Sequence, residues 1–301
     1  MVDAWIVVLR GVQYAAGALL LGLPAFMLYS QRAVGPLNLR WPRQVLIWAT
    51  AALALAAPAA LLAQTAMMAG SFSEAVKPAS LAFMVTGMGL GKALMVRALA
   101  AALALGATLL LRPGRPMWSL LTLLGLIVSA SFAWTGHGAA TEGAGHAVHL
   151  ISDVIHAVAA SIWIGALAAF AVLVGRRPSN NPFWDASVAR SLTGFAGVGT
   201  AAVGALVVTG LINSAYLVGF SKTPSLAASP YGVLLMIKLA LFGLMVALAA
   251  AHRFRLAPLM VREPSQALPH LKKSLTVEFA LALGILAVIA VMGTLPPPAA
   301  L

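Results

Sequence analysis

The sequence predicts an all-α integral membrane protein that crosses a lipid bilayer about eight times. Hydrophobic residues make up 61% of the 301 residues and charged residues only 9%, whereas roughly 25% of the residues in a soluble domain are charged. The mean hydropathy of +0.97 leaves too little polar surface to cover a water-soluble globule. The apolar residues also form long segments, and about 20 such residues cross roughly 30 Å of hydrocarbon.

Eight apolar segments are long enough to span the membrane, and with short loops they form one membrane domain over residues 1–301. Their expected bounds are 5–30, 45–69, 80–111, 117–136, 147–175, 189–219, 231–252 and 274–295. Turn-forming Gly and Pro residues separate the segments, and the run Pro296-Pro297-Pro298 ends the last helix. The first segment lacks the basic region of a signal peptide and is longer than its apolar core, so we expect a retained helix.

Lys and Arg residues are divided unequally between two sets of loops. The loops after the first, third, fifth and seventh segments contain thirteen of them, and the loops after the second, fourth and sixth contain two. Because short cytoplasmic loops are enriched in Lys and Arg, we expect both termini outside, in the periplasm if this is a bacterial inner membrane. The net charge of +12 forms no single patch, which argues against nucleic acid as a partner.

The residue inventory excludes several classes of chemistry. The chain contains no Cys, so it has no disulfide, thiolate metal site or Cys-ligated iron–sulfur cluster. A soft metal would therefore have to be held by Met or His. Nothing resembles a phosphate-binding loop, a Ser–His–Asp arrangement or a pair of catalytic carboxylates. We expect no enzymatic activity.

Six charged residues lie well inside the predicted spans, away from their ends. A charge that faces lipid costs about 2.5–3.5 kcal/mol on insertion scales, so we expect these side chains to face the bundle interior and to pair. Similar depths along the helices suggest the pairs Asp153–Lys238 and Arg97–Glu278. The six residues are Arg10, Lys92, Arg97, Asp153, Lys238 and Glu278, of which Lys92, Arg97, Lys238 and Glu278 are candidate structural or coupling charges.

Four of the six His residues lie in the outer loop or the outer half of the fifth span: His137, His146, His149 and His156. Spacings of 3, 4 and 3 residues from His146 to His156 place these side chains and Asp153 on one helix face. Imidazoles and a carboxylate one turn apart can ligate a first-row metal, or the carboxylate can orient a ligating imidazole. Alternatively, Asp153 and His156 only form a polar contact between helices. His252 and His270 lie near the basic loops, and we assign them no role.

Met residues at the outer ends of several spans favour copper as the metal. Thioethers are soft ligands that select Cu(I), and imidazole also suits Cu(II). Met84 and Met88 are one helical turn apart, although Met is also a routine gap-filler in apolar packing. The candidate metal ligands are His137, His146, His149, Asp153, His156, Met84 and Met88.

Several short motifs, taken in order along the chain, resemble a known family. They are Gly136-His137, His149, Asp153, His156, Trp163-Ile164-Gly165, Tyr231-Gly232, Lys238 and Glu278-Phe279. With the eight-span layout they resemble the bacterial copper-resistance protein D family (CopD/PcoD). The resemblance implies an inner-membrane protein that moves copper from the periplasm towards the cytoplasm. Some relatives carry a fused periplasmic copper-binding domain; no such segment follows the eight spans here, so the resemblance implies a separate periplasmic copper-binding protein of the CopC type.

Three functions remain open at the level of the sequence. In a copper permease, the outer His and Met residues collect the ion, and Asp153 and His156, deeper in the membrane, transfer it inward. A non-transporting assembly or sensing partner would use the same outer site to accept copper. A haem-binding electron carrier would need imidazoles on facing helices at similar depth, whereas the deeply placed His residues belong to one span.

Overall fold

The structure, a computed structural model, describes residues 2–37, 39–136, 139, 141, 143–178, 181–219 and 226–300. These residues contain no strand, and eight of their helices are long and apolar enough to cross a membrane. The predicted all-α, polytopic fold is therefore confirmed. The spans are Ala4–Tyr29, Trp41–Ala69, Gly89–Leu110, Arg115–Thr135, His146–Gly175, Pro182–Val218, Pro230–Arg262 and Pro264–Met292.

Nine α-helices form most of these spans and their extensions: α1 (Val2–Tyr29), α3 (Trp41–Ala69), α6 (Gly89–Leu110), α7 (Arg115–Ser131), α8 (His146–Gly175), α9 (Pro182–Val218), α10 (Pro230–Ala251), α11 (Ala257–Arg262) and α12 (Pro264–Met292). Other elements connect or extend them: α2 (Gln31–Val34), η1 (Gly35–Leu37), α4 (Phe72–Ala75), α5 (Pro78–Gly87), η2 (Phe132–Thr135), η4 (Gly143–Gly145), the π-helical turn η6 (His252–Leu256) and η7 (Pro298–Ala300).

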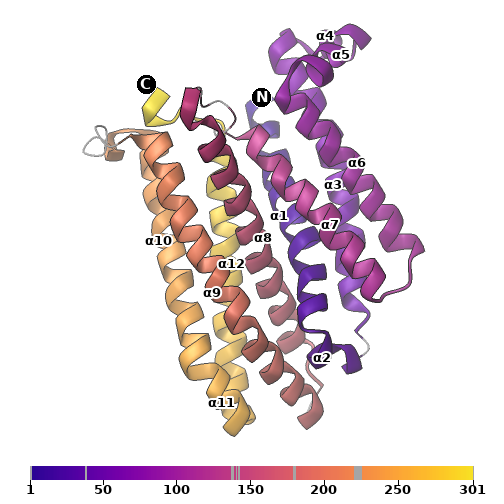
Figure 1. Ribbon diagram of the computed structural model, residues 1–301, viewed down its shortest axis with the longest axis vertical. Helices are drawn as coiled ribbons and strands as arrows, with labels where there is room; N and C mark the ends of the chain where they lie inside the picture. Colours follow the sequence, from indigo (N-terminus) through magenta and orange to yellow (C-terminus); the bar gives the residue numbers. More distant parts are fainter. Residues whose placement is uncertain are drawn as a thin grey trace.

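The helices form two groups that meet at α1 and α8 (Figure 1). Helices α3, α6 and α7 lie on one side, and α9, α10 and α12 lie on the other. Both termini, α4 and α5 lie at one end of the bundle, which we call the terminal end. The opposite end carries α2, the turn between α6 and α7, and α11, and we call it the basic end.

Helices α1 and α8 cross at a pair of glycines. A Cβ atom on Gly22 would lie 2.2 Å from the carbonyl oxygen of Ser161, and one on Gly165 would lie 2.3 Å from Cα of Gly22. Small residues let membrane helices approach closely, and here the backbones are in direct contact. Gly165 of the Trp163-Ile164-Gly165 motif therefore has a packing role at the junction of the two helix groups.

The third predicted span, 80–111, differs from the structure. Helix α5 ends at Gly87, and Met88 has extended backbone (φ −120°, ψ 135°) before α6 begins. The start of α6 packs closely on α5, because a Cβ atom on Gly91 would lie 2.0 Å from the carbonyl oxygen of Met84. Helix α6 is long enough to cross the membrane without α5.

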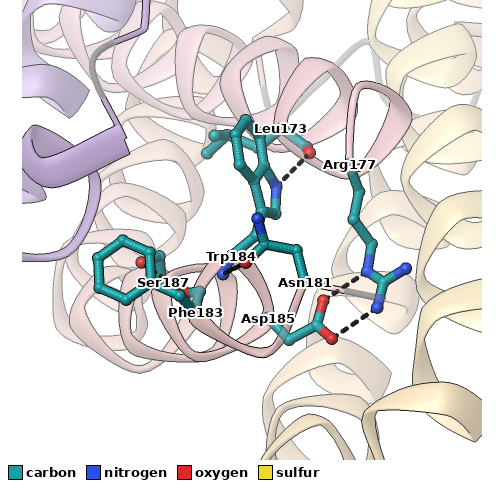
Figure 2. Close-up of polar contacts among 7 residues, drawn as sticks. All are labelled: Leu173, Arg177, Asn181, Phe183, Trp184, Asp185 and Ser187. Atoms are coloured by element: carbon teal, nitrogen blue, oxygen red, sulfur yellow. Dashed lines mark hydrogen bonds and ion pairs between the residues drawn. The ribbon is translucent and has the colours of Figure 1, made fainter. Parts of the chain in front are cut away.

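The connection between α8 and α9 is closed by hydrogen bonds at the basic end (Figure 2). Arg177 donates to both carboxylate oxygens of Asp185, at 2.5 and 2.6 Å, and this hydrogen bonding raises the pKa of Arg177. Asn181 accepts from the backbone N–H of Trp184 at 3.0 Å, and the Trp184 indole donates to the carbonyl of Leu173 at 3.0 Å. Because Asn181 caps it, α9 starts at Pro182, earlier than the predicted 189.

Candidate functional site

His149, Asp153 and His156, which the helical spacing places on one face of α8, all contact α9. His149 is fully buried and stacks on Tyr216, with ring centroids 4.7 Å apart and planes 8° from parallel. One turn further along, Asn213 donates a 2.6 Å hydrogen bond to Oδ1 of Asp153. The hydroxyl of Ser152 donates to the carbonyl of Thr209 at 3.2 Å. These polar contacts join the two helices from the terminal end towards the middle of the bundle.

The protonation of His156 follows from its hydrogen bond to Thr209. Nδ1 of His156 lies 2.8 Å from Oγ1 of Thr209, and that hydroxyl donates to the carbonyl of Ala205 at 2.6 Å. A hydroxyl has one proton, so Thr209 must accept from His156, and a neutral His156 carries its proton on Nδ1. Nε2 then keeps its lone pair and makes no hydrogen bond within the described chain. A hydrogen bond of this kind commonly orients a metal-ligating imidazole.

Two adjoining cavities lie beside this face. The Asp153 cavity, about 240 Å³, is lined by Asp153, Asn213 and Tyr231 among others, and the His156 cavity, about 450 Å³, by His156 and Leu235 among others. His156 and Lys238 line both. Asp153 and Lys238, whose similar depths suggest a pair, both line the Asp153 cavity.

Thr141 joins two of the predicted ligands at the start of α8. Nδ1 of His146 lies 2.8 Å from the carbonyl oxygen of Thr141, which can only accept, so His146 donates this hydrogen bond. The hydroxyl of Thr141 lies 2.7 Å from Nδ1 of His149. His137 lies outside the described residues. Among the residues that are described, no three His, Asp or Glu side chains converge as a metal-binding group.

Met84 and Met88 belong to a different part of the bundle. Met84 is 1% exposed and packs in an apolar cluster with Ala60, Leu61 and Leu94, and Met88 packs against this cluster. The cluster joins α3, α5 and α6, whereas His149 and His156 of α8 face α9. The structure therefore places the two groups of predicted ligands on different sets of helices.

Two expectations for the intramembrane charges differ from the structure. Arg97 is 2% exposed and donates to Gln13 at 2.5 Å and to the hydroxyl of Ser131 at 2.9 Å, whereas Glu278 lies 3.1 Å from Nδ1 of His252. The pair Arg97–Glu278 is thus not formed, because the two side chains face different neighbours.

Lys92 does not face the bundle interior. It is exposed in the first turn of α6, near the terminal end. A long side chain at a helix end can reach the polar interface of a membrane without an ion-pair partner.

The sequence reasoning missed the partners of the α8 face. They are Thr209, Asn213 and Tyr216, spaced 4 and 3 residues apart on α9. These polar residues at helical spacing, in the half of α9 that ends at Val218, are the signal that could have identified them. His252, to which no role was assigned, is a second omission, because it is buried against Glu278.

These features define a polytopic α-helical membrane protein whose ionisable side chains line cavities inside the bundle. The chain belongs to the copper resistance protein D family, as its motifs suggest. The family model for the N-terminal domain of copper resistance protein D-like proteins matches residues 1–147, and the model described as Copper resistance protein D matches residues 189–292.

Three relatives differ in how much of each chain is matched. Copper resistance protein D of Pseudomonas syringae pv. tomato is 36% identical over 310 aligned residues, which cover 99% of this chain and 98% of the relative. Copper transport protein CutJ of Bacillus subtilis (strain 168) is 28% identical over 96% of this chain and 52% of its own length. Inner membrane protein YebZ of Escherichia coli (strain K12) is 28% identical over 58% of this chain and 59% of its own length. No solved structure matches the chain.

Proposed function

We propose that this protein imports copper across a bacterial inner membrane, from the periplasm towards the cytoplasm. The observation that carries the proposal is the hydrogen bond between Nδ1 of His156 and Thr209, which leaves Nε2 as the nitrogen available to a metal beside a cavity inside the bundle. Relatives named for copper resistance and copper transport support copper as the cargo, and one named as an inner membrane protein supports the location. We assign Nε2 of His156 as the copper ligand at the depth of the His156 cavity.

The proposed outer site lies at the start of α8. His146 and His149 are held together by Thr141, and His137 precedes them in the sequence. Imidazole nitrogens ligate copper, so an ion that binds these residues can move along α8 to the level of Asp153 and His156. A carboxylate and an imidazole at that depth could also carry a proton during transport.

The proposed orientation places the terminal end in the periplasm. It is supported by the excess of Lys and Arg in the loops of the opposite end. With this orientation, a separate periplasmic copper-binding protein of the CopC type would deliver the ion to the loop that precedes α8.

Met84 and Met88 are proposed as additional Cu(I) ligands at the terminal end. The substitutions Met84→Leu and Met88→Leu separate this role from packing, because they approximately preserve volume and remove only the thioether. If the thioethers collect copper, uptake falls at low external copper and recovers at high copper. Uptake unchanged at every concentration would restrict both residues to packing.

Uptake of radioactive copper by proteoliposomes tests the proposed function. We expect the His156→Ala and His149→Ala variants to lower the initial rate at least tenfold, since each removes a proposed ligand. His270→Ala is the matched control, because His270 is exposed and bonds only the carbonyl of Gln266 within the described chain. Equal uptake by all variants would contradict the site. Copper binding without uptake by the unmodified protein would favour the alternative function, a non-transporting partner that accepts copper.

A further inference from the structure

A third cavity continues the series between α8, α9, α10 and α12 towards the basic end. This His252 cavity, about 710 Å³, is lined by His252, Arg253 and Glu278 among others. Trp163 lines both the His156 cavity and the His252 cavity. Along α8, the three cavities begin at Asp153, at His156 and at Trp163. Together they follow the helix from its polar face to the opposite end of the bundle.

Trp163 lies at the boundary of the second and third cavities. Its side chain is 3% exposed, and its ring meets Phe242 edge to face, with centroids 5.9 Å apart. Phe242 lines the His156 cavity, and Trp163 lines both this cavity and the His252 cavity, which Glu278 lines. An ion that moves from the first of these cavities to the second would therefore pass beside Trp163.

Glu278 is a buried carboxylate that accepts no hydrogen bond from the described chain. It is 0% exposed, and neither of its oxygens has a hydrogen-bond partner there. Nδ1 of His252 lies 3.1 Å from Oε2, and Nε2 of His252 lies 2.7 Å from the hydroxyl of Ser274. Carboxylates buried in a membrane protein are expensive, and they commonly mark ion or proton pathways. The two oxygens, beside an imidazole and a cavity, suit a bound cation.

The backbone supports a functional role for this pair. His252 is the first residue of the π-helical turn η6, which interrupts the helix between α10 and α11. Such turns are rare and occur frequently at functional sites. Arg253, the next residue, is exposed and lines the same cavity, so its positive charge disfavours long residence of a cation there.

We propose that Glu278 and His252, with Ser274 beside them, form a second copper site on the basic-end side of Trp163. This inference rests on the proposed function and names the next step of the route after His156. Carboxylate and imidazole are ligands for Cu(II), and the imidazole also ligates Cu(I). Trp163 controls transfer between the two levels, and the ion leaves from the His252 cavity at the basic end.

Copper binding and uptake by the full-length chain test the second site. Glu278→Gln and His252→Gln approximately keep the side-chain size but remove the ligands, and Glu263→Gln and His270→Gln make the same changes at exposed positions of the same end. We expect the first two variants to lower copper uptake into proteoliposomes at least tenfold and to bind one copper ion fewer per chain in detergent. The controls should stay within twofold of the unmodified protein.

The possible failures are distinguishable. If the unmodified protein imports copper and both variants import and bind it equally well, the second site is overturned and the proposed function stands. If the unmodified protein imports no copper, the proposed function fails. If the Glu278→Gln and His252→Gln variants elute as aggregates, the His156→Ala variant is measured instead. Its copper-edge absorption spectrum should show imidazole and oxygen ligands. Absence of bound copper in this variant would overturn the second site.

Discussion

The side-chain amide of Asn213 donates a 2.6 Å hydrogen bond to Oδ1 of Asp153, and this contact ties α9 to α8 beside the Asp153 cavity. The hydrogen bond between His156 and Thr209 lies one turn further along and ties the same helices. The polar face of α8 therefore holds two helices together and at the same time orients a potential ligand. The two interpretations of this face, helix contact and metal ligation, are compatible, because one nitrogen of His156 serves each purpose.

Thr209 is predicted to act as a positioning residue. Thr209→Val removes the acceptor that keeps the proton of His156 on Nδ1, so Nε2 is no longer held as the ligand. We expect copper affinity to fall about 10- to 100-fold, the usual range for loss of such a hydrogen bond. Copper titration checks the affinity, and ¹⁵N chemical shifts of the imidazole check the tautomer. Thr209→Ser should restore both, and unchanged shifts in the Val variant would contradict the assignment.

Gly165 is predicted to be indispensable for packing. A methyl group at this position would lie 2.3 Å from Cα of Gly22, so Gly165→Ala must force α1 and α8 apart. We expect a loss of about 1–3 kcal/mol or more, the range for overpacked sites. Thermal unfolding in detergent measures it. Gly194→Ala is the control, since a Cβ atom there meets nothing within 4 Å, and equal melting temperatures would contradict the close crossing.

Arg97 is predicted to stabilise the N-terminal helices without an acidic partner among the described residues. Its guanidinium lies 4.2 Å from the ring centroid of Phe132 and donates to Gln13 and Ser131. Arg97→Gln leaves buried acceptors without donors, which costs about 1–3 kcal/mol for each group. The unfolding temperature should fall clearly, whereas exposed Arg112→Gln should leave it unchanged. A stable Arg97→Gln protein would show that the network contributes little.

The orientation of the bundle can be tested by single-Cys labelling, because the chain contains no Cys. Exposed Ser73 lies in α4 at the terminal end, and exposed Arg112 lies in the turn at the basic end. In intact spheroplasts, a membrane-impermeant maleimide should label Ser73→Cys at once and Arg112→Cys only after permeabilisation. The opposite pattern would reverse the proposed direction of the bundle.

Hydropathy and helical spacing were sufficient for the spans and for the shared face of His149, Asp153 and His156. They were insufficient wherever tertiary contact decides the outcome. Depth along a helix does not give the direction in which a side chain points. Similar depths therefore predict a pair between Arg97 and Glu278, whereas in the structure the two side chains face different neighbours. The continuous hydropathy of residues 80–111 likewise predicts one helix, whereas the structure has a helix break at Met88, where α5 packs closely on α6.

His252 is a second residue whose surroundings cannot be predicted from the local sequence. A His at the end of an apolar segment, among basic residues, reads as a surface residue in sequence. Its burial against Glu278 depends on how α12 packs on η6, which no local pattern specifies.

Anomalous diffraction at the copper edge, from crystals of the copper-loaded protein, tests the central claim most directly. The account predicts a copper peak within bonding distance of Nε2 of His156, at the boundary of the Asp153 and His156 cavities. Copper found only on exposed side chains such as His270, with Nε2 of His156 unligated, would contradict it.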